Sequence, residues 1–212
     1  SPSSVARRMS RVFDVPPAGI EAAMSLHAYY ADMVAQRVAA PTEDLTTALV
    51  QAEIDGERLT ADEVIAFLFL LVVAGNETTT KLLGNALYWA WRHPGTAERV
   101  WADPSLVKGW IEETLRYDNS SQMVARRAAT DIGTPHGVIP EGDRVLLLIG
   151  AANRDGDVFP EPDRYLIDRD ATLAIDADKL SFGVGRHYCM GASLARLEAA
   201  IALEALVAGC RG

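Results

Sequence analysis

The stretch FGVGRHYCMG, residues 182–191, places glycines on both sides of Cys189 and puts His187 two positions before it. Glycine has no side chain, so the backbone of such a stretch can turn sharply and pass close to a bulky, flat group. The helical pattern of residues 190–208 follows directly. Because the first N–H groups of a helix are unpaired, they attract negative charge, and this position therefore favours a thiolate at Cys189.

The residues alone leave several roles open for Cys189. A lone thiolate is a poor zinc site, which needs four ligands, but it can be the single protein ligand of a haem iron. A lone cysteine is also often a small buried hydrophobe. A phosphate-binding loop is the weakest alternative, because the stretch lacks the Gly-Lys-Ser/Thr end of that motif.

The same stretch resembles the haem-thiolate signature of the cytochrome P-450 family at every fixed position, Phe182-Gly183-x-Gly185-Arg186-His187-x-Cys189-x-Gly191. The resemblance implies that Cys189 is the axial ligand of the iron of haem b and that His187 hydrogen-bonds a haem propionate. It also implies that Phe182, Gly183 and Gly191 lie against the cofactor.

The longest helix is expected over residues 61–93, because Thr60-Ala-Asp-Glu63 fits a capping box and Pro94-Gly95 stops the helical pattern. Its longest apolar run, residues 64–75, is too short to span a bilayer. The middle of the helix is apolar all round, which is typical of a central helix in a soluble protein. We therefore expect no membrane span.

The middle of this helix carries a second candidate site. Ala74, Gly75 and Thr78 lie at i, i+1 and i+4, so their small side chains leave a trough on one face. The residues alone also fit a kinked helix with Glu77 facing solvent. The run Ala74-Gly75-Asn76-Glu77-Thr78-Thr79 resembles the family's oxygen-binding stretch. The resemblance implies that Thr78 contacts dioxygen, that Glu77 relays protons, and that Ala74 lies against the haem.

A third motif is Glu113-Thr-Leu-Arg116, whose charged side chains share one helix face at i, i+3. Exposed pairs of this kind are common and contribute little to stability. The motif resembles the family's buried Glu-x-x-Arg pair, which a later arginine joins. FPEPDRY, residues 159–165, resembles that later motif, and the resemblance makes Arg164 the third, structural member.

Further residues are assigned by their distance from these motifs. By resemblance, Arg127 is a second propionate partner, and Arg126 takes this role if the register differs by one; the alternative is a solvated arginine pair on a strand. An arginine suits a carboxylate through paired hydrogen bonds. Their position in the family also makes five residues candidates to face the substrate, namely Leu70, Val73, Ala74, Met123 and Val124.

The expected fold is mainly α with a small β region, and the resemblance implies the C-terminal half of the cytochrome P-450 fold. Residues 1–212 are expected to form a portion of a single haem-thiolate domain that belongs to a longer chain. The expected order is a helical lead-in (1–60), the central helix (61–93), the Glu-x-x-Arg helix (104–117), a small sheet (118–154), a meander with the cysteine loop (155–189) and a last helix (190–208).

The composition narrows the function classes. The chain has 212 residues, a net charge of −9 and no basic stripe, which argues against a nucleic-acid partner. Its two cysteines, Cys189 and Cys210, follow no apolar leader and are interpreted as reduced thiols of a cytoplasmic protein. An acidic surface with local basic patches can still dock a charged protein.

The resemblance implies a haem-thiolate monooxygenase that inserts one atom of dioxygen into a hydrophobic small molecule. The sequence has no flavin or nicotinamide motif, so electrons must come from outside. The implied donors are a ferredoxin-type protein and its NAD(P)H-dependent reductase, which approach near Arg186. Two alternatives stay open: a truncated, non-catalytic haem-binding relative, and a helical interaction domain in which Cys189 belongs to the core.

Overall fold

Helices make up most of the computed structural model, which describes residues 17–169 and 179–209. The chain divides into two compact units, and the boundary along the sequence lies between Ala74 and Gly75. Each unit has its own hydrophobic cluster.

The first unit contains α2 (Pro17–Ala39), α3 (Leu45–Gln51), the strands β1 (Glu53–Ile54) and β2 (Glu57–Arg58), and the first part of α4 (Ala61–Arg92). Its core is formed where α2 meets α4, by Tyr30, Val34, Val64, Ile65 and Leu68. The carboxylate of Asp44 caps α3 by accepting a hydrogen bond of 2.8 Å from the Thr47 N–H. The cap and this cluster fix α3 beside α2.

The lead-in was expected to be helical over residues 1–60, but it contains a short hairpin. β1 and β2 pair antiparallel, with Glu53 opposite Arg58 and Ile54 opposite Glu57. The turn consists of Asp55 and Gly56, whose φ angles are +55° and +84°. Left-handed backbone at both turn positions suits a tight hairpin, because its twist matches that of the two strands. This turn chemistry ends the helical lead-in before residue 60.

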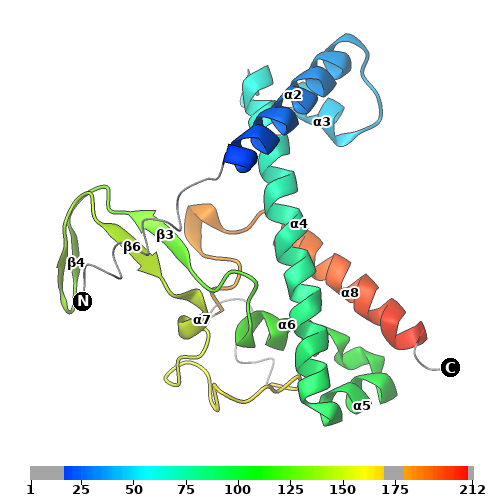
Figure 1. Cartoon of the computed structure of the whole chain (residues 1–212), viewed down its shortest axis with the longest axis vertical. Coiled ribbons are helices and arrows are strands. Elements are labelled where there is room, and N and C mark those ends of the chain that lie inside the picture. Colours follow the sequence, from blue (N-terminus) through cyan, green and yellow to red (C-terminus); the bar gives the residue numbers. More distant parts are fainter. Residues whose placement is uncertain (1–16, 170–178, 210–212) are drawn as a thin grey trace. The chain divides into compact units, whose positions relative to one another are not determined.

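α4 starts and ends within one residue of the expected helix, and Figure 1 shows it unbroken along its length. The capping box is present: the Thr60 N–H donates to Glu63 Oε2 at 2.8 Å, and the Glu63 N–H donates to Thr60 Oγ1 at 3.3 Å. Within the described residues, α4 is the one helix long and apolar enough to cross a membrane. A core helix of a soluble protein passes the same test, so this finding is weak evidence for a span.

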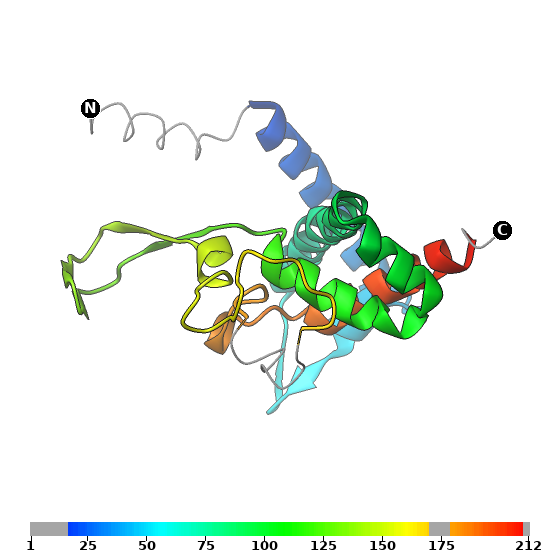
Figure 2. The same ribbon diagram turned by 90° about the horizontal axis from the view of Figure 1, so that it is seen from below.

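The second unit is built on helices that pack around the C-terminal part of α4. Its further helices are α5 (Pro94–Ala102), the 3-10 helix η1 (Pro104–Leu106), α6 (Val107–Tyr117), α7 (Ile149–Ala152), the 3-10 helix η2 (Gly185–His187) and α8 (Ala192–Gly209). α6 lies beside α8, as Figures 1 and 2 both show. The fully buried Trp110 of α6 donates its indole N–H to the Ala86 carbonyl of α4 at 3.1 Å. This bond fixes α6 against α4.

The small β region lies within residues 118–154, as expected. It consists of β3 (Val124–Arg127) paired antiparallel with β6 (Arg144–Leu147), and β4 (Ile132–Thr134) paired antiparallel with β5 (Gly137–Ile139). Figure 2 shows the two ladders following each other along one ribbon. Val124 lies opposite Leu147 and Arg127 opposite Arg144, so the ribbon returns the chain to α7 beside the end of α6.

Gly109 of α6 packs against the backbone of Ile167, in the meander. A Cβ atom at this position would lie 2.0 Å from the Ile167 carbonyl oxygen, which cannot move without the backbone. We expect Gly109→Ala to lower the free energy of unfolding by about 1–3 kcal/mol, because overpacking outweighs the better helix propensity of alanine. Urea unfolding measures this. Gly84→Ala on α4, where the added Cβ meets no atom within 4 Å, is the control and should be neutral or stabilising. Equal stability of the two variants would contradict the close approach.

Candidate functional site

The cysteine loop is closed by its own backbone. The Cys189 N–H donates to the Phe182 carbonyl at 2.9 Å, and the Tyr188 N–H donates to the Gly185 carbonyl at 3.0 Å. Gly183 and Gly185 have φ angles of +73° and +69°, a region that side chains disfavour. The glycines are therefore required by the loop's conformation, and the loop presents Cys189 from a tight backbone frame.

Cys189 is an exposed free cysteine in the part of the chain that the structure describes. Its exposure is inconsistent with the alternative in which this thiol belongs to a packed core. A Cβ added at Gly191 would lie 3.9 Å from Cys189 Sγ, an ordinary van der Waals contact, so the glycine leaves this side of the sulfur uncovered. α8 begins at Ala192, whose N–H donates to the Cys189 carbonyl at 3.2 Å. An accessible thiol beside a glycine-lined loop fits the single protein ligand of a haem. Cys210 lies outside the described residues.

The basic candidates for the propionates are all exposed. His187 lies in η2, just before the cysteine, and Arg127 and Arg126 lie on β3. Adjacent strand residues point to opposite faces, so only one of the two arginines can face a given ligand. Arg126 donates to its neighbouring Ala125 carbonyl at 2.9 Å. Contact of His187 and Arg127 with a propionate remains a prediction.

The candidates on α4 lie on an exposed stretch of the helix. Glu77 pairs with Lys81 at 2.6 Å, and the hydrogen bond from Lys81 lowers the pKa of the Glu77 carboxyl below its usual value. The carbonyl of Thr78 accepts a hydrogen bond of 2.7 Å from the Ser120 hydroxyl, which follows α6. Thr80 bonds back to the Asn76 carbonyl at 2.8 Å. The helix runs through Ala74 and Gly75 without interruption. The exposed Glu77 side chain agrees with the alternative in which this glutamate faces solvent.

Glu113 and Arg116 form a buried pair on α6, with side chains 3% and 1% exposed. Arg116 Nη2 donates to Glu113 Oε1 at 2.7 Å, and Arg116 Nε donates to Oε2 at 2.9 Å. The guanidinium also donates to the carbonyls of Asn153, Pro162 and Arg164, at 2.9 to 3.0 Å. The expected i, i+3 pair is therefore present, and it fixes the backbone that follows α7.

The prediction that Arg164 supplies the third charge is wrong. The Arg164 guanidinium pairs instead with the exposed Glu161, and only its backbone carbonyl reaches Arg116. The third charge is Arg169, whose Nε donates to Glu113 Oε2 at 3.1 Å and whose Nη2 lies 3.3 Å from Oε1. The Arg169 side chain is 11% exposed. The chain turns between the two arginines, and this turn carries Arg169, rather than Arg164, to the carboxylate.

Asn153 connects the meander to the start of the cysteine loop, and the sequence carried no signal for it. Its buried side chain accepts a hydrogen bond of 2.8 Å from the Leu180 N–H and donates to the Ser181 hydroxyl at 3.0 Å. Ser181 in turn donates to the Leu115 carbonyl of α6 at 2.6 Å. These bonds attach residues 180–181 to α6, directly before the loop.

The candidate substrate-facing side chains are exposed within the units that carry them. Leu70 is 51% and Val73 is 55% exposed in the first unit, and Met123 is 54% exposed in the second. Val124 of β3 is half-buried. Large exposed apolar side chains are available to contact an apolar ligand, and the assignment to a substrate remains a prediction.

Comparison with known proteins gives the family. The family model "Cytochrome P450" matches residues 2–211. The chain is 52% identical over 204 residues to the putative cytochrome P450 123 of Mycobacterium tuberculosis, covering 96% of this chain and 50% of that protein. It is 40% identical over 200 residues to the vitamin D(3) 25-hydroxylase of Pseudonocardia autotrophica, covering 93% and 48%.

A solved structure agrees with the sequence relatives. Cytochrome P450 CYP109Q5 from Chondromyces apiculatus superposes with a TM-score of 0.82 at 44% identity, covering 87% of this chain and 46% of that one. The chain thus spans about half the length of the relatives that it matches. The expected mainly helical fold with a small β region, as part of the fold of this family, is confirmed. The chain belongs to the cytochrome P450 family.

Proposed function

We propose that this chain carries the haem-binding part of a haem-thiolate monooxygenase, with Cys189 as the protein ligand of haem b. The single observation that carries the proposal is the exposed, free thiol of Cys189, which lies on a loop whose glycines adopt positive φ angles, in a chain of this family. When bound, the haem would supply dioxygen activation, because a thiolate ligand pushes electron density to the iron and favours O–O cleavage. The protein supplies the ligand, the protons and the positioning.

Different residues near Cys189 are proposed to contact different parts of the haem. His187 and Arg127 are the proposed partners of the propionates, since both side chains are exposed and basic. Gly183 and Gly191 leave room for a flat ring close to the backbone, and Phe182 contributes an apolar surface. Ala74 is the proposed small residue against the ring from α4.

Thr78 and Glu77 are the proposed catalytic residues. The Thr78 hydroxyl would donate a hydrogen bond to dioxygen, and Glu77 would pass protons from solvent through water. Glu77 is exposed, and the hydrogen bond from Lys81 lowers the pKa of its carboxyl, so the side chain is charged at neutral pH. One oxygen atom would enter the substrate and the other would leave as water.

The proposed substrate is a hydrophobic small molecule, for which Met123 and Val124 of the second unit are proposed contacts. The similarity to a vitamin D(3) 25-hydroxylase supports an apolar substrate. The proposed electron donors are a ferredoxin-type protein and its NAD(P)H-dependent reductase, which would dock near the exposed Arg186. We also propose a cytoplasmic, soluble protein, in keeping with the thiol at Cys189.

A second candidate is a non-catalytic haem-binding relative. Both candidates predict bound haem, but only the first predicts a product.

Turnover with heavy-isotope-labelled dioxygen separates the two candidates. The haem-loaded chain is supplied with a ferredoxin, its reductase, NADPH and a panel of hydrophobic substrates, and products are analysed by mass spectrometry. A monooxygenase incorporates one labelled oxygen atom into the product. Bound haem with no labelled product in any reaction would instead support the non-catalytic relative.

A further inference from the structure

α6 carries a second buried carboxylate, Glu112, which belongs to a different network from Glu113. Successive helix residues are rotated by about 100°, so the two glutamates leave α6 in different directions. Glu113 faces residues 164–169 of the meander. Glu112, 7% exposed, faces the segment that enters the cysteine loop and the first turns of α8.

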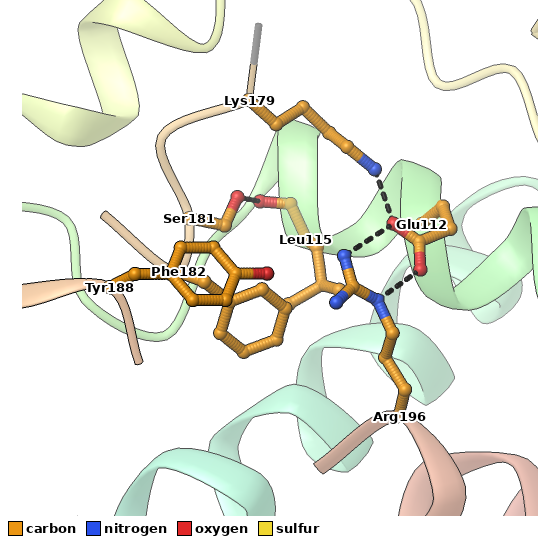
Figure 3. Close-up of a pocket in the computed structure, with 7 residues that line it drawn as sticks. All are labelled: Glu112, Leu115, Lys179, Ser181, Phe182, Tyr188 and Arg196. Carbon is orange, nitrogen blue, oxygen red and sulfur yellow. Dashed lines mark hydrogen bonds and ion pairs between the residues drawn. The ribbon is translucent and has the colours of Figure 1, made fainter. Parts of the chain in front are cut away.

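Both oxygens of Glu112 are held by cations, as Figure 3 shows. Oε1 accepts a hydrogen bond of 2.7 Å from Arg196 Nε, and Oε2 accepts one from Lys179 Nζ. Arg196 Nη2 lies 3.5 Å from Oε2, so the guanidinium spans the carboxylate. Lys179 is itself 7% exposed. A buried carboxylate with two cationic partners avoids the large cost of an isolated buried charge.

The contacts of Arg196 continue to the cysteine loop. Its guanidinium carbon lies 4.6 Å from the centre of the Phe182 ring, a cation–π contact, and Figure 3 places the ring beside the guanidinium. Phe182 packs against the core of the second unit, and its carbonyl accepts the hydrogen bond from the Cys189 N–H. Three consecutive contacts therefore connect the Glu112 carboxylate to the backbone of Cys189.

The charge state of Glu112 agrees with this arrangement. Burial alone would raise the pKa of the carboxyl, but the hydrogen bond from Arg196 and the charge of Lys179 outweigh it and lower the pKa below its usual value. The carboxylate therefore stays ionised at neutral pH, and the contacts to both cations persist.

We propose that Glu112 is a positioning residue for the thiolate ligand: through Arg196 it holds Phe182, and through Lys179 it holds the start of the segment that leads to the loop backbone presenting Cys189. This inference rests on the proposed role of Cys189 as haem ligand. It assigns different tasks to the adjacent glutamates, since Glu113 fixes the meander and Glu112 fixes the entry to the loop.

The first test measures hydrogen exchange of the haem-free chain. Glu112→Gln keeps the shape of the side chain but removes its charge, so the charge-assisted bonds weaken. The amides of Gly183, Tyr188 and Cys189 should exchange faster by about tenfold, the effect of losing one charge-assisted hydrogen bond. The Leu166 amide, which donates to Glu113, should be unchanged. Glu198→Gln on the exposed face of α8 is the matched control and should change none of them.

A second variant, Arg196→Lys, tests the same proposal if Glu112→Gln does not fold. Arg196→Lys retains the positive charge but loses the planar contact with Phe182, so the same three loop amides should exchange faster. Unchanged exchange of the loop amides in both folded variants, or acceleration spread equally to the Leu166 amide, would overturn the proposal.

A spectroscopic measurement separates this proposal from the proposed function. In the haem-loaded, reduced, CO-bound chain, Glu112→Gln should lose part of the thiolate-type band that the unmodified chain shows. A thiolate band in the unmodified chain that is undiminished in Glu112→Gln would overturn the positioning role alone. If the unmodified chain shows no thiolate band, the assignment of Cys189 fails, and the exchange result then reports only on the loop.

Discussion

Replacing Glu113 by Gln should lower the free energy of unfolding by about 3–5 kcal/mol, the usual cost of removing one partner of a buried ion pair. The change leaves the Arg116 guanidinium 1% exposed with no carboxylate beside it. It also weakens the bonds from Arg169 and from the Leu166 N–H to the same carboxylate. Urea unfolding of the haem-free chain measures the loss.

The two candidate third arginines provide matched variants for this network. Arg169→Gln should destabilise the chain clearly, because its guanidinium contacts the buried Glu113. Arg164→Gln should cost at most about 1 kcal/mol, because Arg164 pairs with Glu161 on the exposed surface. A larger loss for Arg164→Gln than for Arg169→Gln would contradict the network described above.

Replacing Thr78 by Ala should slow product formation by about a hundredfold or more, the usual effect of removing one hydrogen-bond donor that is aimed at the reacting group. The variant should keep its thermal stability, because position 78 is exposed and alanine is the better helix former. The measurement is the initial rate of labelled product formation by the haem-loaded chain with its electron donors and NADPH.

Thr80→Ala is the control for the same helix turn. The Thr80 hydroxyl is bonded to the Asn76 carbonyl of its own helix and has no proposed role in the reaction. The Thr80→Ala variant should form product at the same rate as the unmodified chain. If Thr80→Ala and Thr78→Ala lose product formation equally, the effect belongs to the helix surface, and the specific role of Thr78 is wrong.

Much of the fold could be predicted because it depends on local sequence. The capping box at Thr60 and Glu63 fixes the start of α4, and Pro94 ends the helical pattern. Glu113 and Arg116 are three residues apart on one helix, so their pairing follows from helix geometry alone. The cysteine loop is a contiguous motif, and its glycines adopt the backbone that the motif requires.

The errors and omissions concern contacts between segments far apart in the sequence. Arg164 and Arg169 have the same chemistry, and only the path of the irregular chain after α7 decides which one reaches Glu113. Glu112 resembles any helical surface glutamate until α8 and Lys179 cover it. Hydrophobic periodicity predicts the helix in which a residue lies. It does not predict which irregular segment packs against that residue.

The absorption spectrum of the reduced, CO-bound chain tests the central claim most directly. The chain is loaded with haemin, reduced and exposed to CO, alongside Cys189→Ser, whose hydroxyl is a poor substitute for a thiolate ligand. We predict a strongly red-shifted Soret band in the unmodified chain and its loss in Cys189→Ser, because thiolate ligation changes the electron density at the iron. A haem-loaded chain that gives the same unshifted band with and without the Cys189 thiol would contradict the account.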